Sequence, residues 1–270
     1  MIRRLGAVTF AAALAVSVAC AVSLQEETDL GRRYSQQINA EIPLIEDPEI
    51  KAYFERLGTR IAQNADPRKL EYHFFVVNSD VVNAFALPGG YVYLNRGLIE
   101  RAHELSEVAG VLGHEIGHVV ARHGVDQMQK AQAANVGLGI TYILLGRQPT
   151  DVEAAAINVG GGLVFMKFSR DDEREADHLA VDFLIESGID PHGIPAMFKI
   201  LLEERRRRPG LLEQWFSSHP LTEDRIAEVQ EIIARVPEAR LQGLTRDTED
   251  FRRIQARLEG LPPAPKEPSR

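Results

Sequence analysis

The sequence predicts a mostly helical α+β domain in which helices surround one small sheet. Hydrophobic residues make up 44% of the 270 residues, enough for the core of one medium-sized domain or two small ones. Strand-like runs are confined to residues 72–95, and helix-start signals occur on both sides of that stretch. The sequence has no internal repeat at solenoid periods, so a single packed domain is expected.

The N-terminus has the pattern of a secretory signal peptide. Arg3 and Arg4 precede the apolar run LGAVTFAAALAVSVACAVS, which is too short and too rich in small residues for a membrane span. We therefore expect residues 1–20 to be a signal. Two processing patterns stay open, because Ala19–Ala21 fits ordinary cleavage whereas SVAC resembles a lipoprotein signal that would lipidate Cys20. Cys20 is the one cysteine of the chain, so no disulfide is expected in the mature domain.

Two helices and a strand are expected before the turn-rich region. The pattern over residues 24–41 predicts a polar amphipathic helix. Asp47 as N-cap and Pro48 at the first helical position predict a second helix that runs to about Asn64. Aromatic and β-branched residues at 72–78 then predict a strand.

A hairpin and two helices are expected next. The stretch NAFALPGGYVYLN, residues 83–95, predicts two short strands around a Pro-Gly-Gly turn. RGLIERA begins a short helix at residue 96. The stretch LSEVAGVLGHEIGHVVARHG predicts a longer helix from residue 105 that ends at Gly124.

The middle of the chain contains an apolar segment and a second strong helix. Residues 134–146 are too few to span a bilayer and predict a buried or interfacial segment, while VGGGLV at 159–164 suggests a flexible joint. Whether the 134–165 segment forms a lid stays open. Ser169 is expected to cap the helix RDDEREADHLAVDFLIES, which ends before Gly188.

Two further helices and a tail complete the expected chain. Asp190-Pro191 marks a helix start, and a last helix is expected over residues 223–235. The Pro-rich LPPAPKEPSR predicts a disordered end to a tail of residues 241–270. A single domain of residues 24–240 is therefore expected.

Charge argues against a nucleic-acid partner. The formal net charge is -8, whereas nucleic-acid binders carry a basic stripe. The one basic cluster, Arg205–Arg208, is interpreted as the solvated end of a helix.

The stretch GHEIGHVVARH places polar groups in an otherwise apolar helix. His114 and His118 are four residues apart and share one helix face. Burying them with Glu115 and without partners would cost several kcal/mol, a cost that a zinc ion removes by binding both imidazoles. Glu115 is rotated by about 100° from His114, so it would reach a water on the metal and act as the general base.

A catalytic zinc needs a third protein ligand. A histidine six residues after His118 is one known solution, but Gly124 stands there, and His123 is expected to point to a different face. The alternative is a glutamate on a second helix, followed four residues later by an acid that orients a ligand histidine. Glu173 and Asp177 in SRDDEREAD have this spacing.

Four motifs together resemble one family of enzymes. GHEIGHVVARH, SRDDEREAD, NAFALPGGYVYLNRGL and SSHPLTEDRI, spread over about residues 30 to 235, are similar to zinc metallopeptidases of the HtpX, CAAX prenyl protease and Oma type. The resemblance is strongest to the soluble periplasmic, BepA-like branch. It implies a zincin-like (gluzincin) domain with one zinc ion, ligands His114, His118 and Glu173, the base Glu115, and Asp177 beside a ligand histidine.

The resemblance also implies a substrate and a location. Asn83, Ala84 and Phe85 would belong to the edge strand that pairs with an extended substrate. The expected function is a zinc endopeptidase for misfolded or misassembled envelope proteins in the periplasm of a Gram-negative bacterium, with outer-membrane assembly machinery as a partner. The alternative is a periplasmic chaperone with latent or secondary protease activity. Transmembrane helices and the tetratricopeptide repeats of some relatives are expected to be missing, and membrane contact would need a lipid at Cys20.

His219 in WFSSHPLTEDR has two roles open to it. The resemblance places the SHP motif, followed by Arg225-Ile226, near the zinc. His219 could donate a hydrogen bond to the oxyanion, a contribution typically worth about 10²–10³ in rate. Alternatively its neutral imidazole could occupy the fourth zinc position and hold the enzyme latent.

Overall fold

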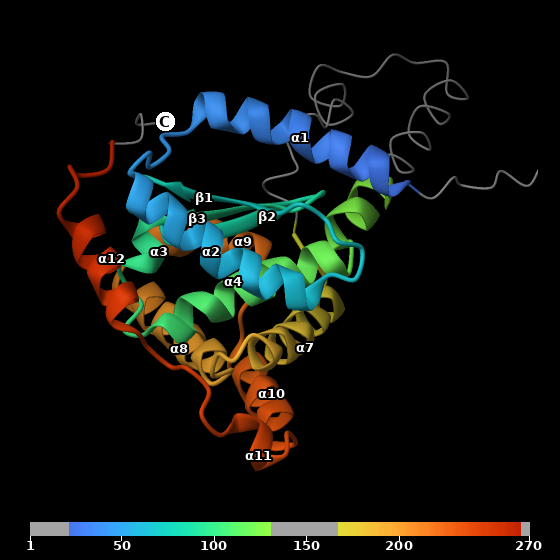
Figure 1. Ribbon diagram of the computed structural model, residues 1–270, viewed down its shortest axis with the longest axis vertical. Helices are drawn as coiled ribbons and strands as arrows, with labels where there is room; N and C mark the ends of the chain where they lie inside the picture. Colours follow the sequence, from blue (N-terminus) through green and yellow to red (C-terminus); the bar gives the residue numbers. More distant parts are fainter. Residues whose placement is uncertain (1–21, 131–166, 266–270) are drawn as a thin grey trace, which may run out of the picture.

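The computed structural model describes residues 22–130 and 167–265, and its elements are arranged as in Figure 1. The sequence predicted an α+β fold of this kind, and the observed mostly helical domain with one small sheet confirms that prediction. In chain order the elements are α1 (Leu24–Glu41), α2 (Pro48–Ala65), β1 (His73–Val77), β2 (Ala84–Leu87), β3 (Tyr91–Asn95), α3 (Arg96–Ile99), α4 (Leu105–Val120), α7 (Arg170–Glu186), α8 (Gly193–Arg207), η2 (Pro209–Leu212), α9 (Glu213–Ser218), α10 (Glu223–Ala234), α11 (Glu238–Leu241) and α12 (Glu249–Glu259).

The sheet has three strands in the order β1-β3-β2. β1 and β3 are parallel, while β2 and β3 form an antiparallel hairpin in which Phe85 is opposite Tyr93. Figure 1 shows α1 lying across one face of the sheet, with the other helices on the opposite side. Ala84 packs in the large core with α2 and α4, whereas Leu87 packs in a smaller cluster beneath α1.

Helices α4 and α7 approach each other closely because small residues line their contact. A Cβ on Gly117 would lie 3.0 Å from the carbonyl oxygen of Ala176, and one on Gly113 would lie 2.6 Å from Cδ1 of Leu184. The expected N-cap is present, since the Ser169 side chain accepts a hydrogen bond from the backbone N–H of Asp172 at 3.1 Å. This close packing brings the first turn of α7 against the histidine-bearing face of α4.

The end of α4 differs from the prediction. The helix ends at Val120 and not at Gly124, and residues 123–130 form a new helical stretch. Arg122 between them has φ of 61°, a left-handed conformation that is uncommon for a residue other than glycine. The chain therefore turns sharply just after the HEIGH motif.

In the C-terminal half, the helix predicted after Asp190-Pro191 is confirmed as α8 but starts slightly later, whereas the prediction that the helix at 223–235 is the last one is wrong. Helix α8 begins at Gly193 because Asp190 forms a turn, in which its carboxylate accepts from the His192 N–H at 3.0 Å. Helix α10 is not the last, since α11 and α12 follow it. Buried apolar side chains hold α12 in the main core, so the folded domain extends beyond residue 240; they are Phe251, Ile254 and Leu258. The interpretation of Arg205–Arg208 as a solvated helix end is confirmed by their exposure.

Several predicted segments lie outside the described residues. They are the signal at 1–20 with Cys20, the apolar stretch at 134–146, the joint at 159–164 and the last five residues of the tail. Within the part of the chain that the structure describes, no helix has both the length and the apolar character that a membrane crossing requires.

Candidate metal centre

The polar residues of the HEIGH motif lie on α4, which is otherwise apolar and buried. Its start is fixed by Glu107, whose carboxylate accepts a hydrogen bond from the backbone N–H of Glu104 at 3.2 Å. Helical periodicity then places His114 and His118 on one face, and both are buried. Glu115 is also buried.

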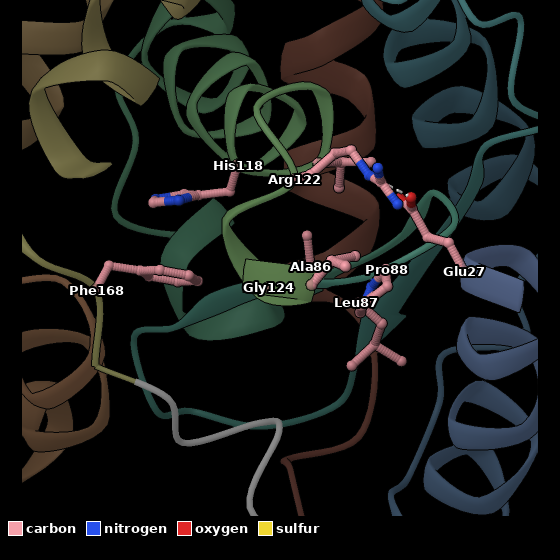
Figure 2. A pocket seen from close by; sticks show the side chains of 10 residues that line it. Glu27, Ala86, Leu87, Pro88, His118, Arg122, Gly124 and Phe168 are labelled. Carbon is pink, nitrogen blue, oxygen red and sulfur yellow. Dashed lines mark hydrogen bonds and ion pairs between the residues drawn. The ribbon is translucent and has the colours of Figure 1, made fainter. Parts of the chain in front are cut away.

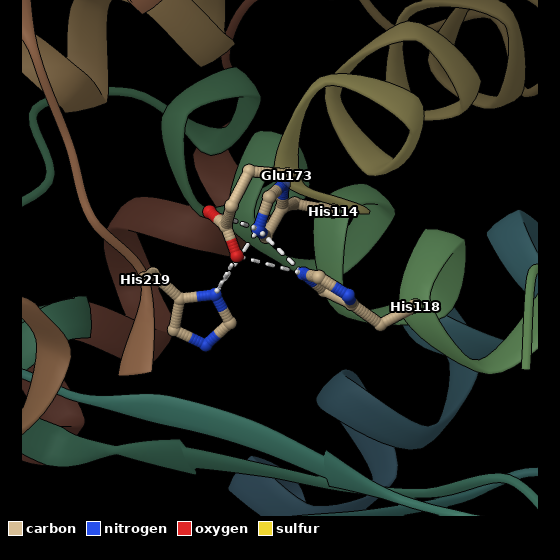
Figure 3. Close-up of side chains that lie close together, drawn as sticks. All are labelled: His114, His118, Glu173 and His219. Atoms are coloured by element: carbon tan, nitrogen blue, oxygen red, sulfur yellow. Dashed lines mark hydrogen bonds and ion pairs between the residues drawn. The ribbon is translucent and has the colours of Figure 1, made fainter. Parts of the chain in front are cut away.

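Four buried side chains converge beside α4 (Figure 3). His114 and His118 come from α4, Glu173 from the first turn of α7, and His219 follows α9 directly. Their facing nitrogen and oxygen atoms all lie within 4.8 Å of one another. The structure thus brings together the three predicted ligand residues and adds His219 as a fourth.

The distances among these atoms fit a tetrahedral metal ion. His114 Nε2 lies 3.1 Å from His118 Nε2 and 3.3 Å from His219 Nδ1. Glu173 Oε1 lies 3.0 Å from His219 Nδ1 and 3.4 Å from His118 Nε2. A tetrahedral ion with bonds of about 2.0–2.1 Å to nitrogen and oxygen requires ligand atoms about 3.3 Å apart. The geometry and the donor types therefore fit one metal ion.

Asp177 and Arg225 support this group from behind. Asp177 Oδ1 lies 2.8 Å from His114 Nδ1, the ring nitrogen that faces away from the cluster. Arg225 donates two hydrogen bonds of 2.8 Å to the Asp177 carboxylate and a third to Glu173. The sequence motif contained Arg225 but did not indicate this contact. A buried arginine here offsets the negative charge of two buried acids.

His118 has a histidine neighbour that the sequence did not predict. Its Nδ1 lies 2.9 Å from Nδ1 of His123, so the expectation that His123 points to a different face is wrong. That expectation assumed a continuous helix, whereas the turn at Arg122 reverses the chain. The ring of Phe168 stacks on His118, with centroids 4.0 Å apart.

Glu115 lies between the cluster and β2. Its Oε1 is 3.6 Å from Nε2 of His219, and the backbone N–H of Ala86 forms a hydrogen bond with its carboxylate. Burial raises the pKa of Glu115, although His219 and His114 act in the opposite direction. Oε1 is buried and has no hydrogen-bond partner among the described residues. An unsatisfied carboxylate oxygen at this place is suited to accept a proton from a water molecule.

The charges in the cluster stabilise one another. Burial acts to raise the pKa of Glu173, but His219 and His118 hold that pKa well below its ordinary value. Burial acts to lower the pKa of His219, but the carboxylates of Glu173 and Glu115 raise that pKa above its ordinary value. Burial holds the pKa of His118 well below its ordinary value, so this imidazole is neutral. Neutral imidazole is the form that binds metals.

The predicted substrate strand lies at an edge of the sheet. β2 is the last strand in the order β1-β3-β2, and Ala84 and Phe85 belong to it. Asn83 precedes it and accepts a hydrogen bond at its backbone oxygen from the N–H of Asn95, at 2.9 Å. Because antiparallel pairs alternate, the backbone groups of Ala84 and Ala86 point away from β3. The outward edge of β2 therefore faces the side of the cluster where Glu115 lies.

A pocket opens beside His118 between the hairpin and the end of α4 (Figure 2). Ala86, Leu87 and Pro88 form one wall, and Phe168 closes it against His118. Glu27 of α1 lies on the far side, where its buried carboxylate accepts a hydrogen bond of 2.8 Å from Nε of Arg122.

Comparison with known proteins gave a consistent set of similarities. The family model described as "Peptidase family M48" matches residues 47–233. The "Beta-barrel assembly-enhancing protease" of Escherichia coli K12 is 32% identical over 258 residues, which is 92% of this chain and 51% of that protein. "Metalloprotease YcaL" of the same organism is 28% identical over 66% of this chain and 68% of its own length. "Mitochondrial metalloendopeptidase OMA1" of Arabidopsis thaliana is 32% identical over 56% of this chain and 29% of its own length. The chain spans about half the length of the assembly-enhancing proteases that it matches.

Proposed function

Because the chain belongs to peptidase family M48, we propose that it is a zinc-dependent endopeptidase with His114, His118 and Glu173 as zinc ligands. The observation that carries the proposal is the tetrahedral spacing of buried donor atoms beside the unsatisfied oxygen of Glu115. Catalytic zinc sites use three protein ligands of this kind and keep one further position for water or substrate.

The residues around the site have distinct tasks in peptide hydrolysis. A bound zinc ion supplies a Lewis acid that polarises the scissile carbonyl and makes an attacking water more acidic. Glu115 accepts the proton of that water and later delivers it to the leaving amine. A raised pKa suits both steps, because the carboxyl group must hold the proton between them. Asp177 and Arg225 keep His114 and Glu173 in position.

The β2 edge is the proposed binding strand for the substrate. An extended peptide would pair with the outward backbone groups of Ala84 and with the carbonyl of Ala86, whose N–H is bonded to Glu115, as in other cases of β-augmentation. Asn83 and Phe85, whose backbone groups face β3, would support the strand. Main-chain pairing requires little of the substrate's side chains, which suits unfolded polypeptides.

For His219 we favour the role of a gate. Its Nδ1 lies at tetrahedral distances from His114 Nε2 and Glu173 Oε1, which supports occupation of the fourth metal position. His219→Ala is then expected to raise casein cleavage or self-cleavage, with exposed His192→Ala as the control. Loss of turnover with intact metal would instead support stabilisation of the oxyanion. An unchanged rate and unchanged metal geometry by X-ray absorption would reject both roles.

The proposed substrates are misfolded or misassembled proteins of the cell envelope. Support comes from the relatives of Escherichia coli and Yersinia pestis, whose names refer to β-barrel assembly. The proposed location is the periplasm of a Gram-negative bacterium, reached through the signal at residues 1–20; plain cleavage and lipidation of Cys20 both stay open, and the lipid would be the membrane contact. Outer-membrane assembly machinery is the proposed partner.

Zinc content and casein cleavage by the purified chain test the enzymatic proposal. Zinc bound at about one ion per chain, with cleavage that a chelator and Glu115→Gln both abolish, is the expected result. Glu173→Ala should lower zinc occupancy and Asp177→Asn should lower it less, while exposed Glu186→Ala at the end of α7 should not change it. Absence of both zinc and cleavage would overturn the proposal. Suppressed aggregation of unfolded protein that persists without cleavage would favour the chaperone alternative.

A further inference from the structure

His118 and His123 form a buried pair of imidazoles outside the set of proposed ligands. Their Nδ1 atoms lie 2.9 Å apart, and both side chains are buried. We propose that His123 is a positioning residue for His118, because its Nδ1 accepts the proton on Nδ1 of His118 and so holds the opposite nitrogen toward the metal. This inference rests on the proposed zinc site.

The position of the shared proton follows from the ligand role of His118. A neutral imidazole carries one proton, on either Nδ1 or Nε2. The atom of His118 in the cluster is Nε2, which lies 3.1 Å from His114 Nε2 and 3.4 Å from Glu173 Oε1. Nε2 must be unprotonated to bind a metal, so the proton of His118 is on Nδ1. Nδ1 of His123, at 2.9 Å, is then the acceptor.

The same reasoning assigns the proton on Nε2 of His123, the ring nitrogen that faces away from His118. A neutral His123 that accepts at Nδ1 carries its proton on Nε2. That nitrogen faces carboxylates of α7, with Glu175 Oε2 at 3.4 Å and Asp172 Oδ1 at 3.9 Å. Asp172 also caps its own helix and is only partly exposed. The acceptors beside Nε2 and the donor beside Nδ1 both favour the tautomer of His123 that carries its proton on Nε2.

The two proposed histidine ligands are therefore supported differently. His114 faces the carboxylate of Asp177 directly, at 2.8 Å. On the side that faces away from the cluster, Nδ1 of His118 contacts the ring of His123, which in turn faces the carboxylate of Glu175. An acceptor behind a ligand histidine fixes its tautomer and ring orientation, and its loss typically costs about 10–100-fold in metal affinity.

The pair depends on the turn after α4. In a continuous helix the fifth residue after His118 would be rotated about 140° away from it. Arg122, with φ of 61°, breaks the helix and returns His123 to His118. Its guanidinium donates 2.8 Å and 2.6 Å hydrogen bonds to the Glu27 carboxylate and the Val22 carbonyl. Phe168 stacks on the other side of His118 and confines the ring.

Three substitutions of His123 separate positioning from packing. His123→Phe keeps a flat ring but has no acceptor, so zinc affinity measured by chelator competition should fall by about 10–100-fold. His123→Asn places an amide oxygen near the position of Nδ1 and should keep the affinity within about tenfold of wild type. His123→Gln places its amide near the position of Nε2 and should behave like Phe. His178→Phe, at an exposed site of α7, is the control.

Nitrogen NMR of the zinc-loaded wild type provides a readout that needs no His123 variant. With ¹⁵N-labelled histidine, the His118 signals should show a protonated Nδ1 and a metal-bound Nε2, and the His123 signals an unprotonated Nδ1. Equal zinc affinity in wild type and His123→Phe, or a protonated Nδ1 on His123, would overturn this inference and leave the proposed zinc site standing. A wild-type chain that binds no zinc would overturn the proposed function, and this inference with it.

Discussion

The two edges of the three-stranded sheet differ in what covers their backbone groups. At the β1 edge the chain before α2 covers the end of the strand, where the N–H of Ile45 donates to the carbonyl of Val76 at 2.8 Å. Further along, the carboxylate of Glu55 on α2 accepts from the N–H of Phe74 at 3.3 Å. The β1 edge is therefore closed to a further strand.

The β2 edge is short and is adjacent to the buried acid. In the described part of the chain, no strand pairs with its outward side, where Ala84 and Ala86 present their backbone groups. The N–H of Ala86 reaches Glu115 instead. Open edges invite aggregation, so proteins normally cover them. The difference teaches that the edge far from the cluster is covered by other parts of the chain, whereas the edge next to the cluster, here called the open edge, has no partner strand among the described residues although Ala84 itself is buried.

The largest effect is expected where the open edge meets the acid. Glu115→Gln keeps the size of the side chain but cannot accept a proton, so kcat should fall by about 10²–10⁴ with zinc content unchanged. Casein cleavage and metal analysis measure this. Glu55→Gln at the covered edge is the matched control and should keep wild-type turnover. Equal losses in both variants would mean that the two edges do not differ in function.

A pH-dependent effect on stability is expected on the covered side. Burial acts to raise the pKa of Asp66, but hydrogen bonds from Arg68 and Tyr72 hold that pKa below its ordinary value of 3.8. Because the folded pKa is lowered, the stabilisation is fully present above the ordinary pKa and is lost as the pH falls through the folded pKa. Asp66→Asn should therefore lower the free energy of unfolding by about 2 kcal/mol at neutral pH.

Urea unfolding as a function of pH measures the contribution of Asp66. The difference between wild type and Asp66→Asn should shrink in acid. A difference that stays constant down to strongly acidic pH would show that the carboxylate is not the cause.

Backbone methylation of a substrate peptide sharpens the assignment of the open edge. Each N-methyl group removes one N–H donor, and a lost hydrogen bond costs about 1 kcal/mol, so kcat/KM should fall by roughly 5- to 10-fold. The losses should alternate with a period of two residues, because the outward carbonyls of β2 belong to Ala84 and Ala86. A uniform loss along the peptide would contradict strand pairing.

The smallest effect is expected from a substitution at the covered β1 edge. Glu55→Ala removes the carboxylate that accepts from the Phe74 N–H, so the free energy of unfolding should fall by about 1 kcal/mol. Urea unfolding measures this change. Activity measured well below the unfolding midpoint should be the same as in wild type. A change in kcat/KM for the folded variant would mean that β1 also contacts the substrate.

Much of the proposed site could be predicted from the sequence because it depends on local periodicity. His114 and His118 are separated by one helical turn, and Glu173 follows a recognisable N-cap at Ser169. The strands at 73–77 and 84–95 were predictable for a similar reason, since a Pro-Gly-Gly turn separates two runs typical of strands.

The rest depends on tertiary contacts that local patterns do not contain. Arg122 lies in the left-handed region although it is neither glycine nor asparagine, because Glu27, about a hundred residues earlier, binds its side chain. Without that turn, His123 could not be predicted beside His118. Arg225 could not be predicted either, since its partners Asp177 and Glu173 lie about fifty residues earlier. The helix α12 was missed because the Pro-rich end of the tail dominated the composition of its surroundings.

The close approach of α4 and α7 also sets the distance between the side chains that the two helices contribute to the cluster. Gly117 lies against the backbone of Ala176, one helical turn from the position of Glu173, so the spacing of the two helices fixes the distance from the carboxylate to the imidazoles. A Cβ at Gly117 would meet Ala176 O at 3.0 Å, closer than ordinary van der Waals contact. Gly117→Ala would therefore push α7 outward by a few tenths of an ångström. The absence of a side chain at residue 117 thus keeps the carboxylate of Glu173 within 3.4 Å of His118 Nε2.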